Sequence, residues 1–321
     1  MRENGVEVAC FADDDKEKQV EGFVGLPVIA TEQLSKMGGG KNILISSYGP
    51  EKVVKRLKTM DVNLLDRLVS VDFYLWEGGL DYYNYYLEHG EEIETADALL
   101  ADDKSRKVFY NLLQYKISRD PKLIAEIRDD ACLQYFDLSV IRFGEGEVFL
   151  DLGAYNGDTV EAFAERMNGK YREIIAMEPD AENYVKLRAV ADRLRNVKCY
   201  PYGVGESDGT IRFSANATQS SFVADNGETE IEIRSVDSLM AGRKLTFLKA
   251  DIEGLEKQML AGAAKTIAEQ SPQMAIAVYH CKEDIFRIIN TIHSYSRDYA
   301  FYLCHYTEMP IDTVLYAVLK N

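Results

Sequence analysis

Basic residues are scarce in this 321-residue sequence, in which 37 lysines and arginines stand against 53 aspartates and glutamates. The formal net charge of −16 argues against a nucleic-acid partner, because binding to phosphates requires a basic face that displaces counterions. The sequence also lacks a secretory signal peptide and an apolar run long enough to cross a bilayer. We therefore expect no membrane insertion, and a neutral or cationic small molecule as partner.

Cysteine is rare as well, and its spacing is uninformative. The five cysteines are odd in number and include no Cys-x-x-Cys pair, which argues against a disulfide framework and against a zinc site. Reduced thiols are typical of the cytoplasm, so we predict a cytoplasmic location. With 46% apolar and 11% aromatic residues, the chain can bury sizeable cores, and its length favours two domains.

The Gly-x-Gly-x-x-Gly fingerprint of dinucleotide-binding folds is absent too. Residues 6–12 nevertheless predict a strand that ends before Asp13, where a Rossmann unit would carry a ribose-binding acid. The chain begins too late to include the preceding strand and its glycine-rich turn. We therefore expect residues 1–60 to form a partial Rossmann-like α/β domain that serves packing or association into a homo-oligomer. Its further strands and helices are expected at residues 25–34, 42–47 and 50–58.

The most informative segment present runs from Val148 to Thr159. It begins with a continuous apolar strand, which is typical of a parallel sheet covered on both faces. A turn with two glycines follows, where a ligand can approach the backbone. The acids Asp151 and Asp158 would repel a pyrophosphate and favour a ligand that carries an ammonium or sulfonium. The residues expected to bind this cofactor are Asp151, Gly153, Tyr155, Asn156, Gly157, Asp158 and Thr159.

A second acid follows the next predicted strand, residues 173–177. Glu178 lies at the carboxyl end of this strand, where an acid can accept hydrogen bonds from both hydroxyls of a ribose. Pro179 fits the first position of the following helix. The structural alternative is that Asp151 only caps a helix and that Glu178 is a solvated strand end.

From about Asp97 to its C-terminus the sequence resembles the FkbM-type S-adenosylmethionine-dependent methyltransferases. The resemblance implies a class I methyltransferase fold with a seven-stranded Rossmann-like sheet, and transfer of a methyl group to oxygen, often on a sugar or polyketide-like acceptor. We accordingly expect a tyrosine-rich helical connector over residues 61–145 and the methyltransferase domain over residues 146–321. The matching pieces are DDKSRKVFYNLL (102–113), QYFD (134–137), VFLDLGAYNGDTV (148–160), AMEPDAEN (176–183), FLKADIEGLE (247–256), LAGAAKTI (260–267), VYH (278–280) and TVLYAV (313–318).

Candidate catalytic residues follow two later strands, predicted over residues 245–250 and 274–279. The first strand delivers Asp251 and Glu253, and the second delivers His280, to the edge of the sheet where ligands bind. A hydroxyl nucleophile needs a proton acceptor, and His280 has the pKa range for that role. Asp251 would either orient the imidazole or hold the acceptor hydroxyl. The same groups could instead bind a divalent metal that lowers the hydroxyl pKa, although the sequence assigns no metal ligands. The structural alternative is that His280 lies at a strand end with its hydrogen bonds satisfied and has no catalytic role.

Two other functions compete with methyl transfer. One is a nicotinamide-dependent oxidoreductase, which the missing glycine fingerprint argues against. The other is a non-catalytic scaffold in a glycan-assembly complex. The expected reaction, O-methylation of a sugar or glycan intermediate in polysaccharide biosynthesis, would proceed by in-line displacement at the sulfonium methyl.

Overall fold

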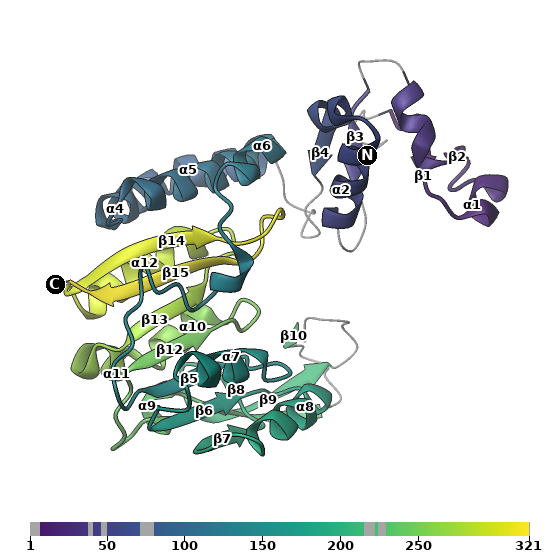
Figure 1. Cartoon of the computed structure of the whole chain (residues 1–321). Coiled ribbons are helices and arrows are strands. Elements are labelled where there is room, and N and C mark those ends of the chain that lie inside the picture. Colours follow the sequence, from purple (N-terminus) through teal and green to yellow (C-terminus); the bar gives the residue numbers. More distant parts are fainter. Residues whose placement is uncertain are drawn as a thin grey trace. The chain divides into compact units, whose positions relative to one another are not determined.

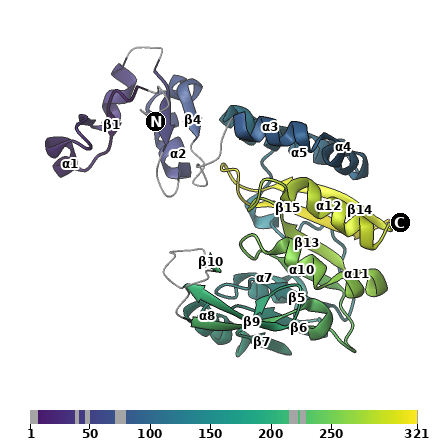
Figure 2. The same cartoon turned by 180° about the vertical axis from the view of Figure 1, so that it is seen from behind.

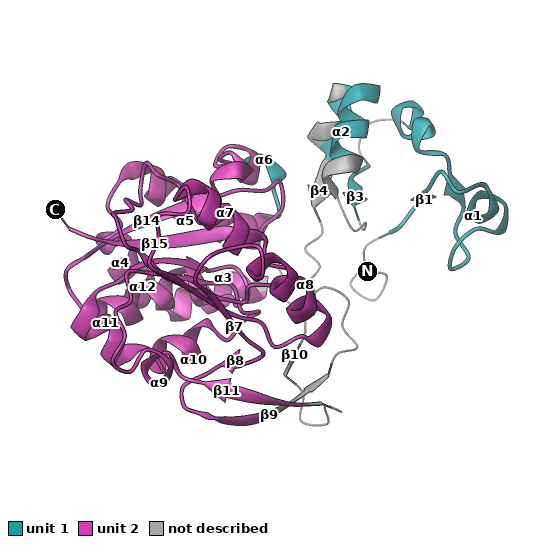
Figure 3. Ribbon diagram, turned by 60° about the horizontal axis from the view of Figure 1, so that its bottom comes forward, with its two compact units in different colours: residues 1–76, 119–122 teal, residues 77–118, 123–321 magenta. Residues whose placement is uncertain are grey.

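The computed structural model describes residues 7–37, 41–45, 50–70, 80–214, 222–223 and 229–320. The chain divides into two compact units, unit 1 with Met1–Trp76 and Arg119–Lys122, and unit 2 with Glu77–Ser118 and Leu123–Asn321 (Figure 3). The domain boundaries expected near residues 60 and 145 stay a prediction. In the described part of the chain, no helix has the length and apolar character needed to cross a membrane.

Unit 1 consists of short strands and helices around a small core of Leu34, Ile45, Leu57 and Leu64. Strand β1 pairs in parallel with β2, and β3 pairs in parallel with β4. Asp13 accepts hydrogen bonds from the Lys18 ammonium (2.7 Å) and from the backbone of Asp15 (3.0 Å). The elements are β1 Phe11–Ala12, α1 Lys16–Glu21, β2 Val28–Ile29, the 3₁₀ helix Thr31–Lys36, β3 Ile43–Ile45, α2 Pro50–Met60, the 3₁₀ helix Val62–Arg67 and β4 Leu68–Ser70.

Unit 2 is built on a seven-stranded sheet in the order β14-β15-β13-β12-β5-β6-β7. The central strands pair in parallel, and β15 is antiparallel to both of its neighbours. This arrangement confirms the expected class I methyltransferase fold. The strands are β5 Val148–Leu152, β6 Glu173–Met177, β7 Val197–Tyr200, β12 Phe247–Ala250, β13 Gln273–Ala277, β14 Tyr299–His305 and β15 Thr313–Leu319.

Hydrophobic cores lie on both faces of this sheet. Every residue of β5 is buried, and its side chains alternate, because Val148 and Leu150 join one core while Phe149 joins the other. The apolar run that predicts a strand covered on both faces is thus confirmed. The helices of this part are α7 Asp158–Arg166, α8 Ala181–Ala191, α9 Val236–Leu239, α10 Glu256–Ala261, α11 Ala264–Gln270 and α12 Asp284–Tyr295.

A second, smaller sheet of unit 2 has the order β10-β9-β11-β8. Strand β11 pairs in parallel with β8 and antiparallel with β9. The carboxylate of Asp208, just before β9, accepts hydrogen bonds from the backbone of Ser235 (2.9 Å) and the hydroxyl of Ser238 (2.7 Å). The strands are β8 Gly203–Val204, β9 Gly209–Ser214, β10 Phe222–Val223 and β11 Thr229–Arg234.

The helices α4 and α5 of unit 2 pack against the helix α12 and the edge strand β14 of the large sheet. Helix α5 contacts β14, and α4 contacts α12, as both views of the chain show (Figures 1 and 2). One face of α5 buries Val108, Phe109, Leu112 and Leu113, so the predicted amphipathic helix is confirmed. The elements are α3 Leu80–Glu88, α4 Gly90–Leu99, α5 Asp103–Ser118, α6 Pro121–Ala125, of which the first two residues group with unit 1, and the 3₁₀ helix Ala131–Leu133.

Candidate functional site

The glycine turn that follows β5 packs directly against the residue that follows β12. Gly153 has a φ of 75° and Gly157 a φ of 90°, a region that L side chains rarely adopt. A Cβ atom built on Gly153 would lie 1.9 Å from the carbonyl oxygen of Asp251, and one on Gly157 would lie 3.0 Å from Val190 Cβ. Close approach, as well as backbone conformation, therefore requires glycine at both positions.

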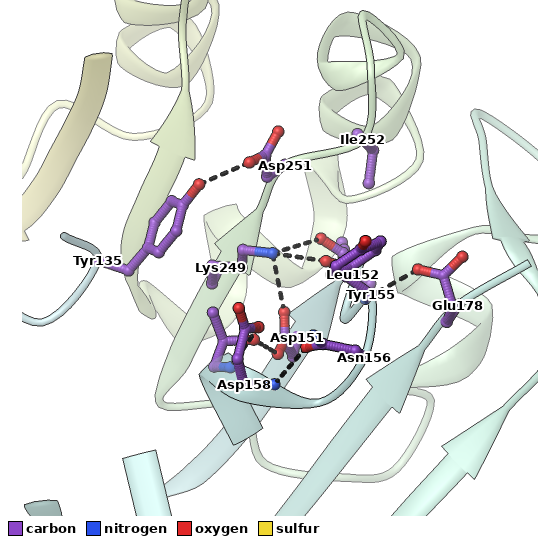
Figure 4. A network of polar contacts seen from close by, with 12 residues as sticks. Tyr135, Asp151, Leu152, Tyr155, Asn156, Asp158, Glu178, Lys249, Asp251 and Ile252 are labelled. Carbon is purple, nitrogen blue, oxygen red and sulfur yellow. Dashed lines mark hydrogen bonds and ion pairs between the residues drawn. The ribbon is translucent and has the colours of Figure 1, made fainter. Parts of the chain in front are cut away.

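Asp151 lies beneath this turn, where its side chain is fully buried. Its Oδ1 is 3.2 Å from Lys249 Nζ, and its Oδ2 accepts a hydrogen bond from the hydroxyl of Thr159 (Figure 4). Burial opposes the charge of Lys249, but the carboxylates of Asp151 and Asp251 outweigh it and raise the Lys249 pKa. Asp151 thus holds the turn through Lys249 and Thr159, and its role in binding the cofactor stays a prediction.

Lys249 also connects Asp151 to the backbone of the turn. Its ammonium donates a hydrogen bond to the carbonyl oxygen of Gly153 (2.7 Å) and lies 5.1 Å from the ring centroid of Tyr135. The side chain is only 3% exposed. Sequence reasoning missed this residue, because a lysine inside an apolar strand gives no sign of its partner on the neighbouring strand.

Glu178 ties the second strand end to the same turn. Its Oε2 accepts a hydrogen bond from the backbone N–H of Tyr155 (2.9 Å; Figure 4). Its Oε1 accepts one from the backbone N–H of Asp180 (2.9 Å). Glu178 is 7% exposed, and this burial raises its pKa against the effect of the two backbone hydrogen bonds. It is therefore not a solvated strand end, and each oxygen keeps a second lone pair for a ligand.

The helix after β6 begins later than the sequence predicts. Asp180 is the N-cap of α8, and its side chain accepts a hydrogen bond from the backbone N–H of Asn183. Helix α8 therefore starts at Ala181, and Pro179 lies in the connection before it. Asp180 marks the start of the helix more strongly than Pro179 does. Its carboxylate accepts a hydrogen bond from a free backbone N–H of the first turn, whereas a proline only has no such N–H to satisfy.

The remaining residues expected to bind the cofactor lie together around the start of α7. Tyr155 has a φ of 46° and is 43% exposed. Asn156 accepts a hydrogen bond from the backbone N–H of Asp158 (3.1 Å), and Asp158 accepts one from the N–H of Thr159 (2.8 Å). The turn is thus ordered by its own side chains, with Tyr155 at its surface.

Asp251, at the carboxyl end of β12, is held by two phenols. Its Oδ2 accepts a hydrogen bond of 2.6 Å from Tyr135, and its Oδ1 accepts one of 3.2 Å from Tyr279. Burial and the Asp251 charge hold the pKa of both phenols well above the usual range, so both stay hydrogen-bond donors. Sequence reasoning gave these tyrosines no role, although both lie in segments, QYFD and VYH, that carry the family resemblance.

His280 lies among the carboxylates that the sequence predicts around it. Its Nε2 is 3.4 Å from Asp251 Oδ1 and 3.5 Å from Glu253 Oε2, and its Nδ1 is 3.0 Å from Oε1 of Glu256. Burial opposes protonation, but Glu256 above all, with Asp251 and Glu253, raises the His280 pKa to about 9. The imidazole is therefore charged at neutral pH, and its role as general base stays a prediction.

Glu253 has an unusual backbone and an unusual carboxyl group. Its φ of 56° is in the left-handed region, which a non-glycine residue adopts at a cost and which is common at functional sites. Burial, with the nearby charges of Asp251 and Glu256, raises its pKa to about 6 despite the opposing charge of His280. Its side chain is 35% exposed, against 22% for Asp251 and none for Glu256, so Glu253 is the most exposed carboxylate of this cluster.

Comparison with known proteins agrees with this geometry. Residues 151–302 match a family model described as a methyltransferase FkbM domain. The crystal structure of a methyltransferase FkbM from Methylobacillus flagellatus KT is 25% identical and superposes with a TM-score of 0.75, over 97% of this chain and 84% of that chain. A search of curated proteins found no match.

Two further solved structures show much weaker similarity. A fibrillarin from Aeropyrum pernix with natively bound S-adenosyl-L-methionine is 15% identical over 59% of this chain and 73% of that chain, with a TM-score of 0.35. An rRNA methylase from Streptococcus thermophilus is 13% identical over 62% of this chain and 93% of that chain, with a TM-score of 0.36. Scores this low support no inference about function.

The family match, the seven-stranded sheet and the glycine turn beside an acid-rich strand end agree with one another. The family match also favours methyl transfer over nicotinamide chemistry. Residues 151–302 therefore form a methyltransferase FkbM domain, in a chain that is similar in fold to a solved FkbM methyltransferase.

Proposed function

We propose that the chain transfers the methyl group of S-adenosylmethionine to a hydroxyl of a sugar or glycan intermediate, in the cytoplasm, as a step of polysaccharide biosynthesis. The close contact between Gly153 and Asp251 is the observation that supports this proposal best. It brings the cofactor turn and a hydrogen-bonding carboxylate to one edge of the sheet, which is where ligands of doubly wound sheets bind. The negative charge of the chain favours a neutral or cationic acceptor.

The donor would be held by the two successive strand ends. In this proposal the free lone pairs of Glu178 accept hydrogen bonds from the ribose hydroxyls, since both carboxylate oxygens are already oriented by backbone N–H groups. The Gly153–Gly157 turn receives the rest of the molecule along its exposed backbone. Asp151 acts indirectly, because its ion pair with Lys249 fixes the conformation of the turn.

The acceptor hydroxyl would bind at Asp251. Tyr135 and Tyr279 fix this carboxylate by hydrogen bonds, and such fixed geometry favours in-line attack on the methyl carbon. The acceptor oxygen forms a bond to the methyl carbon while the bond from carbon to sulfur breaks, which yields S-adenosylhomocysteine. The hydroxyl proton passes to Glu253, the most exposed carboxylate beside Asp251. His280 is the alternative acceptor from the sequence, in the fraction of chains in which its ring has lost its own proton.

The acceptor class can be tested directly with the purified chain. Tritiated S-adenosylmethionine is incubated with a panel of deoxy-sugar glycans, and the labelled product is analysed by NMR. We expect a methyl ether on a sugar hydroxyl, and no label in a reaction with the Asp251→Asn variant. Methylation at nitrogen or carbon would contradict O-methyl transfer. Tight binding of S-adenosylhomocysteine without transfer to any acceptor would favour the scaffold function.

Unit 1 has a separate proposed role in packing or association, without a dinucleotide. The support is that Asp13 is already hydrogen-bonded to Lys18 and Asp15, and that the sequence contains no Gly-x-Gly-x-x-Gly. Saturation-transfer NMR of the full chain with NADH should give no signal. Light scattering should show an oligomer, whereas a monomer would contradict the association role.

A further inference from the structure

We propose that Asp251, Glu256 and His280 bind one divalent cation of the Mn²⁺ class. One ligand atom from each of the three residues lies within 4.8 Å of the other two. Asp251 follows β12, Glu256 begins α10, and His280 follows β13, so three separate elements bring their side chains to one point. Neither the family match nor the similar structures assign a metal to this place.

The buried polar atoms of this cluster lack aligned hydrogen bonds. Among the described residues, neither ring nitrogen of His280 has an aligned hydrogen bond, and Oε2 of Glu256 has none. The side chain of His280 is 5% exposed and that of Glu256 is fully buried. The His280 nitrogens face carboxylates at 3.0–3.5 Å without an aligned hydrogen bond. Buried polar groups are usually hydrogen-bonded, so these atoms fit ligands of an ion.

The charge of the cluster also calls for a cation. Glu253 adds a third carboxylate beside His280, and Asp284, which is 1% exposed, interacts electrostatically with Glu256. Of the nearby lysines, Lys249 pairs with Asp151 and Lys257 pairs with Glu283. The protonated His280 supplies one positive charge to these carboxylates. A divalent cation bound in place of that proton would supply two, together with its coordination bonds.

The ligand set indicates which ion fits. Two carboxylates and one imidazole suit a hard cation such as Mn²⁺ better than a soft one, because carboxylate oxygens are the preferred ligands of Mn²⁺. Ligands of such an ion lie about 2.0–2.2 Å from it, so ligand atoms within 4.8 Å of one another can converge after small side-chain rotations. Asp251 is 22% exposed, which leaves coordination positions open toward solvent, as in catalytic metal sites.

A cation at this site would take part in the proposed reaction, but binding of the cation does not require that the proposed reaction is correct. Bound beside the acceptor hydroxyl, the ion would lower the hydroxyl pKa, and Glu253, outside the ligand set, would still receive the proton. That role rests on the proposed O-methyl transfer, whereas binding of the ion does not. The test is therefore a binding measurement that contains neither methyl donor nor acceptor.

The experiment adds Mn²⁺ to the full chain after treatment with EDTA and counts the free ion from its EPR signal. We expect one bound ion per chain, and a spin-echo spectrum with nitrogen modulation from an imidazole. His280→Gln and Asp251→Asn should each weaken Mn²⁺ binding by about tenfold or more. The matched controls, His293→Gln and Glu269→Gln, change a histidine and a glutamate outside the cluster and should bind as the unmodified chain does.

The possible results of this experiment test the metal site independently of the proposed O-methyl transfer. Loss of Mn²⁺ binding in both cluster variants, with S-adenosylhomocysteine still bound, supports the site and shows that the variants are folded. Absence of a bound ion, absence of nitrogen modulation in the unmodified chain, or equal affinity in cluster variants and controls would overturn it. Each of these results leaves O-methyl transfer open to its own test.

Discussion

Gly153 approaches the backbone carbonyl of Asp251 so closely that a Cβ atom at position 153 would lie 1.9 Å from the carbonyl oxygen. The turn expected to hold the cofactor and the acid expected to hold the acceptor therefore touch through their backbones. In the proposed reaction, this contact would hold the methyl donor and the acceptor in a fixed relative position. In a reaction catalysed mainly by positioning, such a contact is part of the mechanism.

Replacing Gly153 by Ala should disrupt this contact. The new methyl group must displace backbone, so we expect a loss of stability of about 1–3 kcal/mol from overpacking, in addition to the strain of a positive φ, and weaker S-adenosylhomocysteine binding. Gly169→Ala is the matched control, because Gly169 has a φ of 68° and no atom within 4 Å of a built Cβ. Urea unfolding and calorimetry measure both effects, and equal losses in the two variants would contradict the contact.

Replacing Lys249 by Met should leave the buried charge of Asp151 without its partner. Both side chains are almost fully buried, at 3% and 0% exposure, and breaking a buried ion pair costs about 3–5 kcal/mol. Adding Asp151→Asn to this variant should recover part of the free energy of unfolding, because the uncompensated charge is then removed. A Lys249→Met variant as stable as the unmodified chain would show that the pair does not support the turn.

The acid–base state of His280 can be measured by NMR in the presence of EDTA. The sequence has four histidines, so His280→Gln identifies the resonance. We expect a pKa of about 9, raised by the surrounding carboxylates against the effect of burial. A folded-state pKa above the ordinary 6.5 gives stability that is fully present below pH 6.5 and lost as the pH rises through 9, at most about 3 kcal/mol. A measured pKa near 6.5 would contradict this environment.

Glu253 should matter for turnover and not for cofactor binding. With a pKa of about 6, its carboxylate is mostly ionised at neutral pH and can accept the hydroxyl proton. Glu253→Gln should reduce turnover by about 10²–10⁴-fold, with S-adenosylhomocysteine affinity unchanged, whereas the exposed Glu269→Gln should behave as the unmodified chain does. Full turnover in Glu253→Gln would leave His280 as the base to examine next.

The positions of Glu178, Asp251 and His280 could be predicted from the sequence because the carboxyl ends of parallel strands meet at one edge of a sheet. The continuous apolar run of β5 also predicts that strand, since such a run fits a strand that is covered on both faces. Long-range contacts could not be predicted. The burial of Asp151 depends on Lys249 in the neighbouring strand, and the hydrogen bond from Tyr135 to Asp251 joins residues far apart in sequence.

The most direct test of a methyltransferase site at this sheet edge is calorimetric titration with S-adenosylhomocysteine of the unmodified chain and of Glu178→Gln. Loss of hydrogen bonds between a carboxylate and the ribose should cost about 1.5–3 kcal/mol, so affinity should fall at least about tenfold. Glu182→Gln, an exposed glutamate on α8, is the control and should bind normally. Unchanged affinity in a folded Glu178→Gln variant, or no binding by the unmodified chain, would contradict the account.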